Sequence, residues 1–524
     1  RGHPVNRISN VQNLRSRQFH EDAGPLAHPV RPAEYKEINN FYTATIYEKG
    51  AEVIGMLKTL VGDADYRRAL DLYFQRHDGK AATIEDWLAV FEDTTGRDLS
   101  QFKLWYSQSG TPRVRVHEEF ENGTYTLTLS QSNADTPGQS DKKPQVIPVA
   151  IGLLNPNGDE VLPTTVLELG KSEQSFAFHD LAGRPVASIL RGFSAPVILE
   201  RDQREQERLF LLEHDTDPFN KWEAARRLAT DTLVEMVRDD REPSRAFLAA
   251  LRSVLNDTSL DPAFRALVMS LPGEDDLAKT LADLGETPDP VAIHFARRSL
   301  ASGIATFARD DLAQIKRDMR ISGPYSAAAA DAGKRALSSA ALALLSLVDG
   351  AETARRAFDD ADNMTERLSA LSCLLRAGVG AEQSNRFHEE WQNNDLVLDK
   401  WFTLEASHAT PETAVQTAIN LANHPKFDWQ NPNRFRSLIA GFSLMNPAGF
   451  HDPGGKGYAF LADWLIRLDP LNPQTTARMT TAFQTWRRYD DRRRGMMKAE
   501  LKRLLATPGL SRDTSEMTER ILAR

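Results

Sequence analysis

The sequence predicts a multidomain, mainly α-helical protein with a helical first part, a small β-sandwich and a C-terminal α-solenoid. A chain of 524 residues is too long for a single hydrophobic core. The hydrophobic period changes from helical to alternating at Gly110-Thr111-Pro112 and returns to helical at about Asp202. The expected domains are therefore residues 1–111, 112–203 and 204–524.

The first part is organised around residues 37–54, where a helix is expected to start and to continue to about Leu60. Its apolar stripe consists of Ile46, Val53, Ile54, Leu57, Leu60 and Val61. Gly50 interrupts this helix, and because a mid-helix glycine costs about 1 kcal/mol relative to alanine, we expect close packing there. Tyr42 and Tyr47 lie near the helix start, and the ordinary interpretation of such a pair is two core aromatics.

Two more amphipathic helices are expected, at Asp63–Gln75 and Thr83–Thr95. Thr83 is a plausible N-cap because acidic residues follow it in the first turn. The segment Glu21–Pro32 is rich in Pro, Gly and His and indicates a loop.

Short alternating segments predict the strands of the sandwich. Alternation is seen at 113–116 and at 125–129 after an Asn-Gly turn. The run 146–154 is strongly apolar, and 176–178 and 197–199 supply further short strands. The polar loop 133–144 is expected to be exposed.

A repeated start signal predicts helices through the last domain. A capping side chain directly before Pro occurs at Asp217, Asp261, Asp289, Thr410 and Asn472. Paired helices of this kind stack into a curved α-solenoid, whose concave face would suit a cover over an active site.

Composition narrows the functional class. The chain is 41% hydrophobic and 26% charged, its net charge is −9 and its pI is about 5.8, which argues against nucleic-acid binding. Its single cysteine, Cys373, excludes internal disulfides and favours a reducing, cytoplasmic compartment. The sequence contains no run of 18 apolar residues, so no membrane span is expected.

Residues 39–53, NNFYTATIYEKGAEV, resemble the segment that carries the catalytic tyrosine in bacterial zinc aminopeptidases of the aminopeptidase N family, in the gluzincin superfamily. The similarity extends along the chain. The other matching runs are 21–25 and 27–32, YFQRHDG at 73–79, WYSQSGTP at 105–112 and NPNRFRSL at 431–438. The resemblance implies that residues 1–111 are the C-terminal helical part of a thermolysin-like catalytic domain.

The resemblance also implies site roles. Tyr47 takes the place of the catalytic tyrosine, whose neutral hydroxyl donates to the oxyanion of a tetrahedral intermediate. Asn39 and Tyr42 would line the cavity wall. Arg436 would reach toward the C-terminal side of a bound peptide, and Gln474 and Arg478 would lie at the cavity mouth.

The zinc motif of the family, H-E-x-x-H, is missing. His20-Glu21 is followed by Gly24, and His388-Glu389 by Gln392, so both pairs are interpreted as surface residues. We therefore expect zinc in the full-length enzyme, no metal ligand in this chain, and a C-terminal portion that is inactive alone. The expected partners are peptide substrates of a monomer, without nucleic acid or membrane.

Two alternatives stay open. A non-enzymatic β-sandwich and α-solenoid could bind peptides or a partner protein. A related epoxide hydrolase/aminopeptidase of the same superfamily is the other, although residues 39–53 fit the bacterial aminopeptidase better. The preferred first residue of the substrate does not follow from the sequence.

Overall fold

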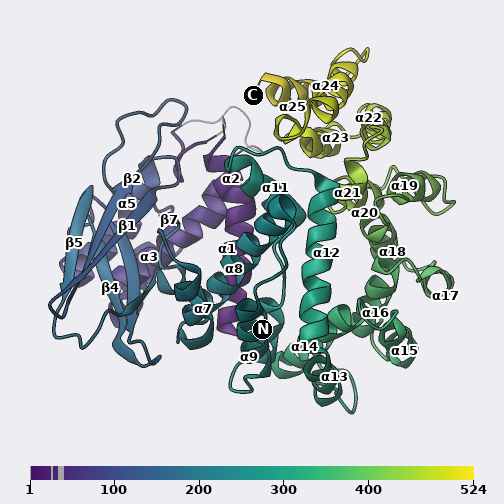
Figure 1. The fold of residues 1–524 in the computed structure, drawn as a ribbon. Helices are drawn as coiled ribbons and strands as arrows, with labels where there is room; N and C mark the ends of the chain where they lie inside the picture. Colours follow the sequence, from purple (N-terminus) through teal and green to yellow (C-terminus); the bar gives the residue numbers. More distant parts are fainter. Residues whose placement is uncertain (1, 25–26, 34–40, 524) are drawn as a thin grey trace. The chain divides into compact units, whose positions relative to one another are not determined.

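The computed structural model describes residues 2–24, 27–33 and 41–523, which form two compact units, Arg1–Arg227 and Leu228–Arg524 (Figure 1). Asn39 lies outside the described residues. The fold class is confirmed: the chain is mainly α-helical, with one small β region and a long series of paired helices.

The first unit begins with helices. Their bounds are α1 His3–Asn13, η1 Leu14–Gln18, α2 Phe19–Asp22, η3 Thr45–Lys49, α3 Gly50–Val61, α4 Asp63–His77, α5 Ile84–Thr95 and α6 Leu104–Ser107. Both η1 and η3 are single π-helical turns continuous with α-helices. The predicted helix start and the two amphipathic helices are confirmed, and Thr83 caps α5 in a reciprocal capping box with Asp86.

Two expectations for α3 are wrong. Ile54 belongs to the predicted apolar stripe, yet it is exposed. Gly50 is not required by close packing, because a Cβ there would meet only Val30 Cγ1 at 3.6 Å, an ordinary contact.

The β region consists of two sheets. The strands are β1 Arg113–Glu121, β2 Thr124–Ser132, β3 Ile147–Leu154, β4 Glu160–Leu169, β5 Glu173–Phe178, β6 Val186–Ile189 and β7 Ile198–Glu200. The sheet orders are β5-β2-β1-β7 and β4-β3-β6. Asn122 and Gly123 both have positive φ and join β1 to β2 in the expected tight turn.

The sequence did not predict β4 and β6. β4 contains Pro163 and is largely exposed, both of which weaken a strand signal and suit its place at a sheet edge. β3 is buried along its whole length, and α3 packs against β3 and β4. The helix that carries the tyrosine motif therefore rests on the sandwich.

Two helices close the first unit and lead into the second. They are α7 Glu205–His214 and α8 Pro218–Asp239, after the short 3-10 turn η4 Arg191–Phe193.

The second unit is helical throughout. Its elements are α9 Arg245–Asn256, α10 Pro262–Val268, α11 Glu274–Asp283, α12 Pro290–Phe307, α13 Arg309–Asp318, α14 Ala329–Leu345, α15 Glu352–Asp360, α16 Met364–Arg376, α17 Ala381–Trp391, α18 Asp395–His408, α19 Ala414–Ala422, α20 Pro432–Ser443, α21 Pro447–Phe450, α22 Lys456–Leu468, α23 Pro473–Thr480, η5 Thr481–Phe483, η6 Trp486–Arg488, α24 Asp491–Leu505 and α25 Arg512–Ala523.

These helices form the predicted α-solenoid. Alternate helices α14, α16, α18, α20, α22 and α24 each contact the next, and α15, α17, α19, α23 and α25 pack beside them (Figure 1). Asp261, Asp289 and Asn472 cap their helices as expected. Thr410 does not: residues 411–413 form a turn, and α19 begins at Ala414.

A continuous aromatic and aliphatic core runs through these pairs. Trp401 and Trp464 are buried in it, whereas Trp391 is only partly buried. Cys373 is a free, buried thiol whose pKa is raised by burial, which fits an inert core residue. No helix in the described part of the chain is both long and apolar enough to cross a membrane.

Candidate active site

The π-helical turn Thr45–Lys49 presents one side chain outward and buries two. Thr45 and Lys49 are buried, while Tyr47 between them is 60% exposed. Tyr42, 58% exposed, stacks on Tyr47 with ring centroids 6.2 Å apart and an interplanar angle of 26°. The interpretation of these tyrosines as core aromatics is therefore wrong for this structure, which instead brings together two exposed rings.

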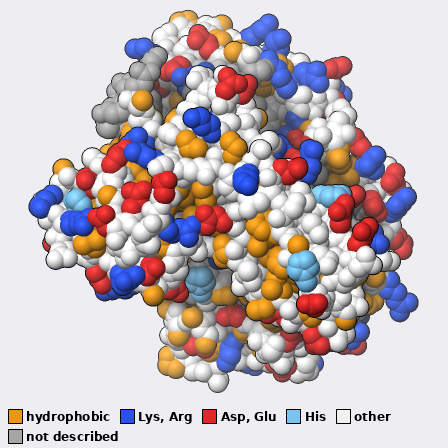
Figure 2. Space-filling view, turned by 90° about the vertical axis from the view of Figure 1, so that its left-hand side faces the viewer, with side chains coloured by type: hydrophobic (Ala, Val, Ile, Leu, Met, Phe, Trp, Pro, Cys, Tyr) orange, Lys and Arg blue, Asp and Glu red, His pale blue; other side chains and the backbone are white. Residues whose placement is uncertain are grey.

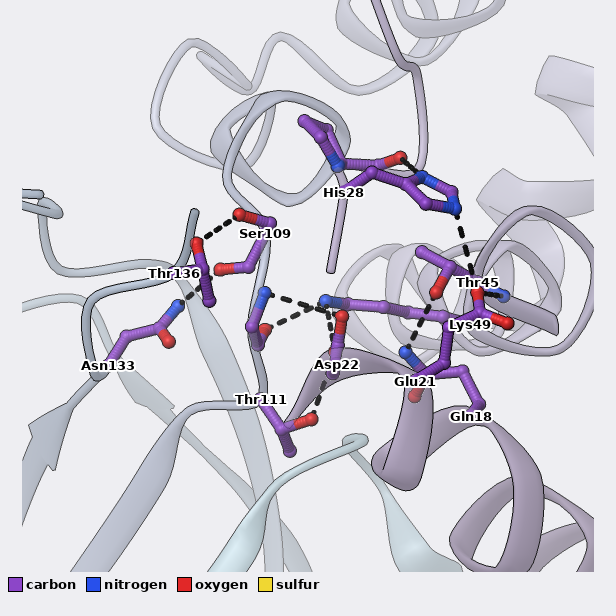
Figure 3. Close-up of polar contacts among 12 residues, drawn as sticks. Gln18, Glu21, Asp22, His28, Thr45, Lys49, Ser109, Thr111, Asn133 and Thr136 are labelled. Atoms are coloured by element: carbon purple, nitrogen blue, oxygen red, sulfur yellow. Dashed lines mark hydrogen bonds and ion pairs between the residues drawn. The ribbon is translucent and has the colours of Figure 1, made fainter. Parts of the chain in front are cut away.

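A second π-helical turn packs against the first. Gln18, at the end of η1, is buried and donates from Nε2 to Thr45 Oγ1 at 3.3 Å (Figure 3). Isolated π-helical turns are rare and are frequent at functional sites. Two in contact beside an exposed tyrosine pair mark this region as the candidate site.

Glu21 satisfies backbone donors at the start of the tyrosine helix. Its carboxylate accepts from Thr45 N at 2.9 Å and from Ala44 N at 3.3 Å. The first N–H groups of a helix have no partner within the helix, so a distant carboxylate acts here as the cap. The expectation that Glu21 is an ordinary surface residue is wrong, because its side chain is only 23% exposed.

His28 pairs with that carboxylate. Its Nε2 lies 3.5 Å from Glu21 Oε1, and its Nδ1 lies 2.7 Å from the Pro29 carbonyl oxygen (Figure 3). Burial raises the pKa of Glu21, but the contacts with His28 and Thr45 outweigh burial and leave the pKa at about 2. The Glu21 contact raises the pKa of His28 above its ordinary value, against the effect of burial. The two pKa shifts favour a charged pair.

Below the tyrosine lies a buried ion pair. Lys49 Nζ is 2.9 Å from Asp22 Oδ2, and each side chain is 1% exposed. Lys49 also donates to the Gly110 carbonyl at 2.8 Å, while Asp22 accepts from Thr111 Oγ1 at 2.9 Å and from Gly110 N at 3.3 Å (Figure 3). Both charged groups are thus paired and hydrogen-bonded inside the protein, as a buried charge requires.

Gly110 is the crowded point of this network. Its φ is +85°, and a Cβ there would lie 2.7 Å from Asn133 Oδ1 and 2.9 Å from Lys142 Nζ. Asn133 and Lys142 both donate to the neighbouring Ser109 carbonyl, at 3.2 and 2.9 Å. The loop 133–144 was expected to be exposed, and it mostly is, but these residues brace the segment that Lys49 reaches.

The remaining predicted residues lie in the second unit. Arg436, on α20, is partly buried and donates to Asn433 Oδ1 at 2.6 Å. Gln474 and Arg478 are exposed one turn apart on α23. Their roles stay predictions.

Sequence reasoning missed Glu21, Asp22, His28 and Lys49 as members of the site. One signal was present: Lys49 precedes Val53 and Leu57 at four-residue steps, which places a lysine on the buried face of the helix. The acidic pair lies in one of the runs that carry the family resemblance. Their convergence depends on contacts across 27 and 61 positions of sequence.

The described residues contain no candidate metal site. Within residues 2–24, 27–33 and 41–523, no three His, Cys, Asp or Glu side chains are grouped so that they could hold a metal ion. The described residues therefore do not fit a zinc site. On the face of the molecule in Figure 2, acidic and basic side chains are interspersed.

Three domain families match the chain in succession. Residues 4–106 match the peptidase family M1 domain, residues 110–202 match a domain of unknown function (DUF3458) with an Ig-like fold, and residues 205–523 match a domain of unknown function (DUF3458_C) with ARM repeats.

Whole-chain similarity agrees with these matches. Aminopeptidase N of Caulobacter vibrioides is 44% identical over 531 residues, which cover 100% of this chain and 61% of that protein. Aminopeptidase N of Escherichia coli is 38% identical over 539 residues, covering 99% and 61%. The crystal structure of Legionella pneumophila aminopeptidase A in complex with aspartic acid superposes with a TM-score of 0.82 at 28% identity, covering 94% of this chain and 58% of that one. The chain thus spans about three fifths of the length of these relatives.

Proposed function

Because this chain belongs to the peptidase family M1 and also matches both DUF3458 domains, we propose that it is the C-terminal part of a zinc-dependent aminopeptidase. The enzyme would release N-terminal amino acids from peptides. The observation that carries the proposal is Tyr47, exposed on a rigidly held π-helical turn at the position the family motif gives to its catalytic tyrosine.

Tyr47 donates a hydrogen bond to the oxyanion that develops on the scissile carbonyl. A tyrosine hydroxyl suits this role because it is neutral and carries one donor. Tyr42 lines the cavity wall beside it. The resemblance assigns Asn39 to the same wall, but Asn39 lies outside the described residues. Arg436, Gln474 and Arg478 meet the more distant part of the peptide, as the solenoid limits access.

Zinc is the expected cofactor, with its ligands on sequence that this chain does not include. The chain alone is then expected neither to bind stoichiometric zinc nor to cleave peptides. Metal analysis and an aminoacyl-anilide assay of the purified chain test this; one zinc per chain together with turnover above background would refute it.

The direct test is Tyr47→Phe in an enzyme that joins this chain to the rest of its catalytic domain. We expect kcat to fall by about 10² or more, the usual scale for losing one oxyanion donor. KM should change little, because the hydroxyl meets charge that appears only in the transition state. Stability should be nearly unchanged, since the ring and its stacking remain.

Tyr42→Phe is the matched control, because it removes the same hydroxyl from the stacked neighbour. Its effect on kcat should be milder. If Tyr47→Phe keeps near-normal kcat in folded, metal-loaded enzyme, the assignment is wrong. If the joined enzyme has no peptidase activity, a peptide- or protein-binding module becomes the better reading.

We propose a cytoplasmic monomer as the working form. The single buried cysteine supports the compartment, because it fits a reducing environment. Sedimentation analysis and fractionation of the source cells test it.

A further inference from the structure

We propose that the buried pair Asp22–Lys49, closed by the Gly110 carbonyl, is a positioning clamp that sets the direction in which Tyr47 points. This inference rests on the proposed function for its kinetic consequence. The structural part, the ordering of the π-helical turn, stands apart from any activity.

The geometry of the turn carries the argument. Thr45, Tyr47 and Lys49 alternate inward, outward, inward within the five-residue π turn. The inner two are each fastened to another element: Thr45 to Gln18 and Glu21, Lys49 to Asp22 and Gly110 (Figure 3). With both inner residues fixed, the backbone between them is held so that the Cα–Cβ bond of Tyr47 points outward.

Stability alone does not account for a pair of this kind. Replacing a buried ion pair by well-packed apolar side chains is often neutral or stabilising. What a buried pair supplies that apolar packing does not is directional registry, since Lys49 must meet both a carboxylate and one particular carbonyl oxygen.

That carbonyl is itself held in place. Gly110 has φ +85°, a conformation that favours glycine, and a Cβ there would displace the ends of the Asn133 and Lys142 side chains. Its neighbour Ser109 accepts from the same two residues, which belong to the loop between β2 and β3. Asp22 also accepts a hydrogen bond from Thr111, which lies two positions before β1. The clamp therefore fixes the position of the tyrosine turn relative to the sandwich, and not only within its own helix.

Hydrogen exchange on this chain tests the structural part. The variant Asp22→Asn/Lys49→Met removes both charges while roughly keeping side-chain size. We expect faster amide exchange in residues 44–49. The matched control is Glu118→Gln/Arg201→Met, because that pair is similarly buried in the same unit, with side chains 12% and 5% exposed, and does not touch Tyr47. Equal exchange of residues 44–49 in both variants would overturn the clamp.

Kinetics of the joined enzyme test the functional part. The Asp22/Lys49 variant should lose roughly 10- to 100-fold in kcat, the scale of a small misplacement of a catalytic group, with KM within about twofold. In a Tyr47→Phe background the same change should cost little more, because the clamp acts through the hydroxyl already removed. An unchanged kcat, or a loss of equal size in both backgrounds, would overturn the proposal.

Thr111→Val provides a gentler variant if the charge removal prevents folding. It deletes one hydrogen bond to Asp22 and keeps the ion pair, so a smaller loss in kcat with the same dependence on Tyr47 is expected. The two proposals fail separately: a normal Tyr47→Phe enzyme removes the catalytic assignment, whereas an impaired Tyr47→Phe enzyme with an unaffected clamp variant removes only the clamp.

Discussion

At the residue scale, the pair Glu21–His28 shows how local contacts give one helix start a dependence on pH. Glu21 caps the tyrosine helix and His28 stabilises its charged form. The Glu21 contact raises the pKa of His28, so the stabilisation it provides is complete below the ordinary value of 6.5 and is lost as pH rises through the higher folded value. Burial raises the pKa of Glu21, yet His28 and Thr45 lower it to about 2, so its stabilisation is complete above the ordinary value of 4.5 and is lost as pH falls toward 2.

The pair should therefore contribute most between pH 4.5 and 6.5. We expect the difference in free energy of unfolding between the native chain and His28→Gln to shrink as pH is raised from about 6 to about 9. Urea denaturation at a series of pH values measures it. His117→Gln, at an exposed histidine 3.2 Å from Glu119, serves as the control. A difference for His28→Gln that stays constant over this range would contradict the prediction.

At the element scale, Gly152 allows the segment after β6 to pack closely against β3. Arg191 lies directly over Gly152, where a Cβ would come within 2.1 Å of the guanidinium carbon. The guanidinium is 2% exposed and contacts Asp215 at 3.1 Å, Glu160 at 2.5 Å and Ser188 at 2.9 Å. The apolar run that predicted β3 gives no hint of this, because Gly in a strand usually only weakens it.

Gly152→Ala should accordingly destabilise the chain, although the backbone of Gly152 has no positive φ that would exclude alanine. Overpacking costs about 1–3 kcal/mol, and displacing Arg191 from buried Asp215 would raise the loss toward roughly 3–5 kcal/mol. Urea denaturation gives the value. Gly183→Ala is the matched control, since no atom lies within 4 Å of its would-be Cβ, and it should change stability little. Equal midpoints for the two variants would show that Arg191 moves aside at no cost.

At the scale of the whole molecule, the chain joins three matched domains. The solenoid domain is proposed to limit access of peptides to the site. Arg478, exposed and one turn from Gln474, is the residue whose predicted place at the mouth can be probed without touching the core.

Arg478→Glu should change kcat/KM for longer peptides more than for single-residue anilides, because a residue at the mouth meets only substrates long enough to reach it. Lys502→Glu, an exposed charge reversal on α24, should affect both substrate types little. Steady-state kinetics on the joined enzyme compares them. Similar effects of Arg478→Glu on short and long substrates would count against a mouth position.

Local patterns in the sequence were enough for most elements. The change of hydrophobic period located the sandwich, Asn-Gly located its first turn, and Asp or Asn before Pro located three solenoid helices, because each signal acts within a few residues. Motif resemblance marked Tyr47 and Tyr42, which the structure brings into a stacked, exposed pair. The domain limits 1–111, 112–203 and 204–524 stay predictions.

Tertiary structure alone decided the rest. It placed β4 at a sheet edge despite Pro163, turned Thr410 from a cap into part of a turn, and converted Glu21 from an apparent surface residue into a helix cap. It also buried Lys49 against Asp22 and Gly110. These outcomes depend on groups far apart in sequence, whose pairing is set by packing. The helical period placed Lys49 on a buried face, but no local period or composition encodes the partners that these residues meet.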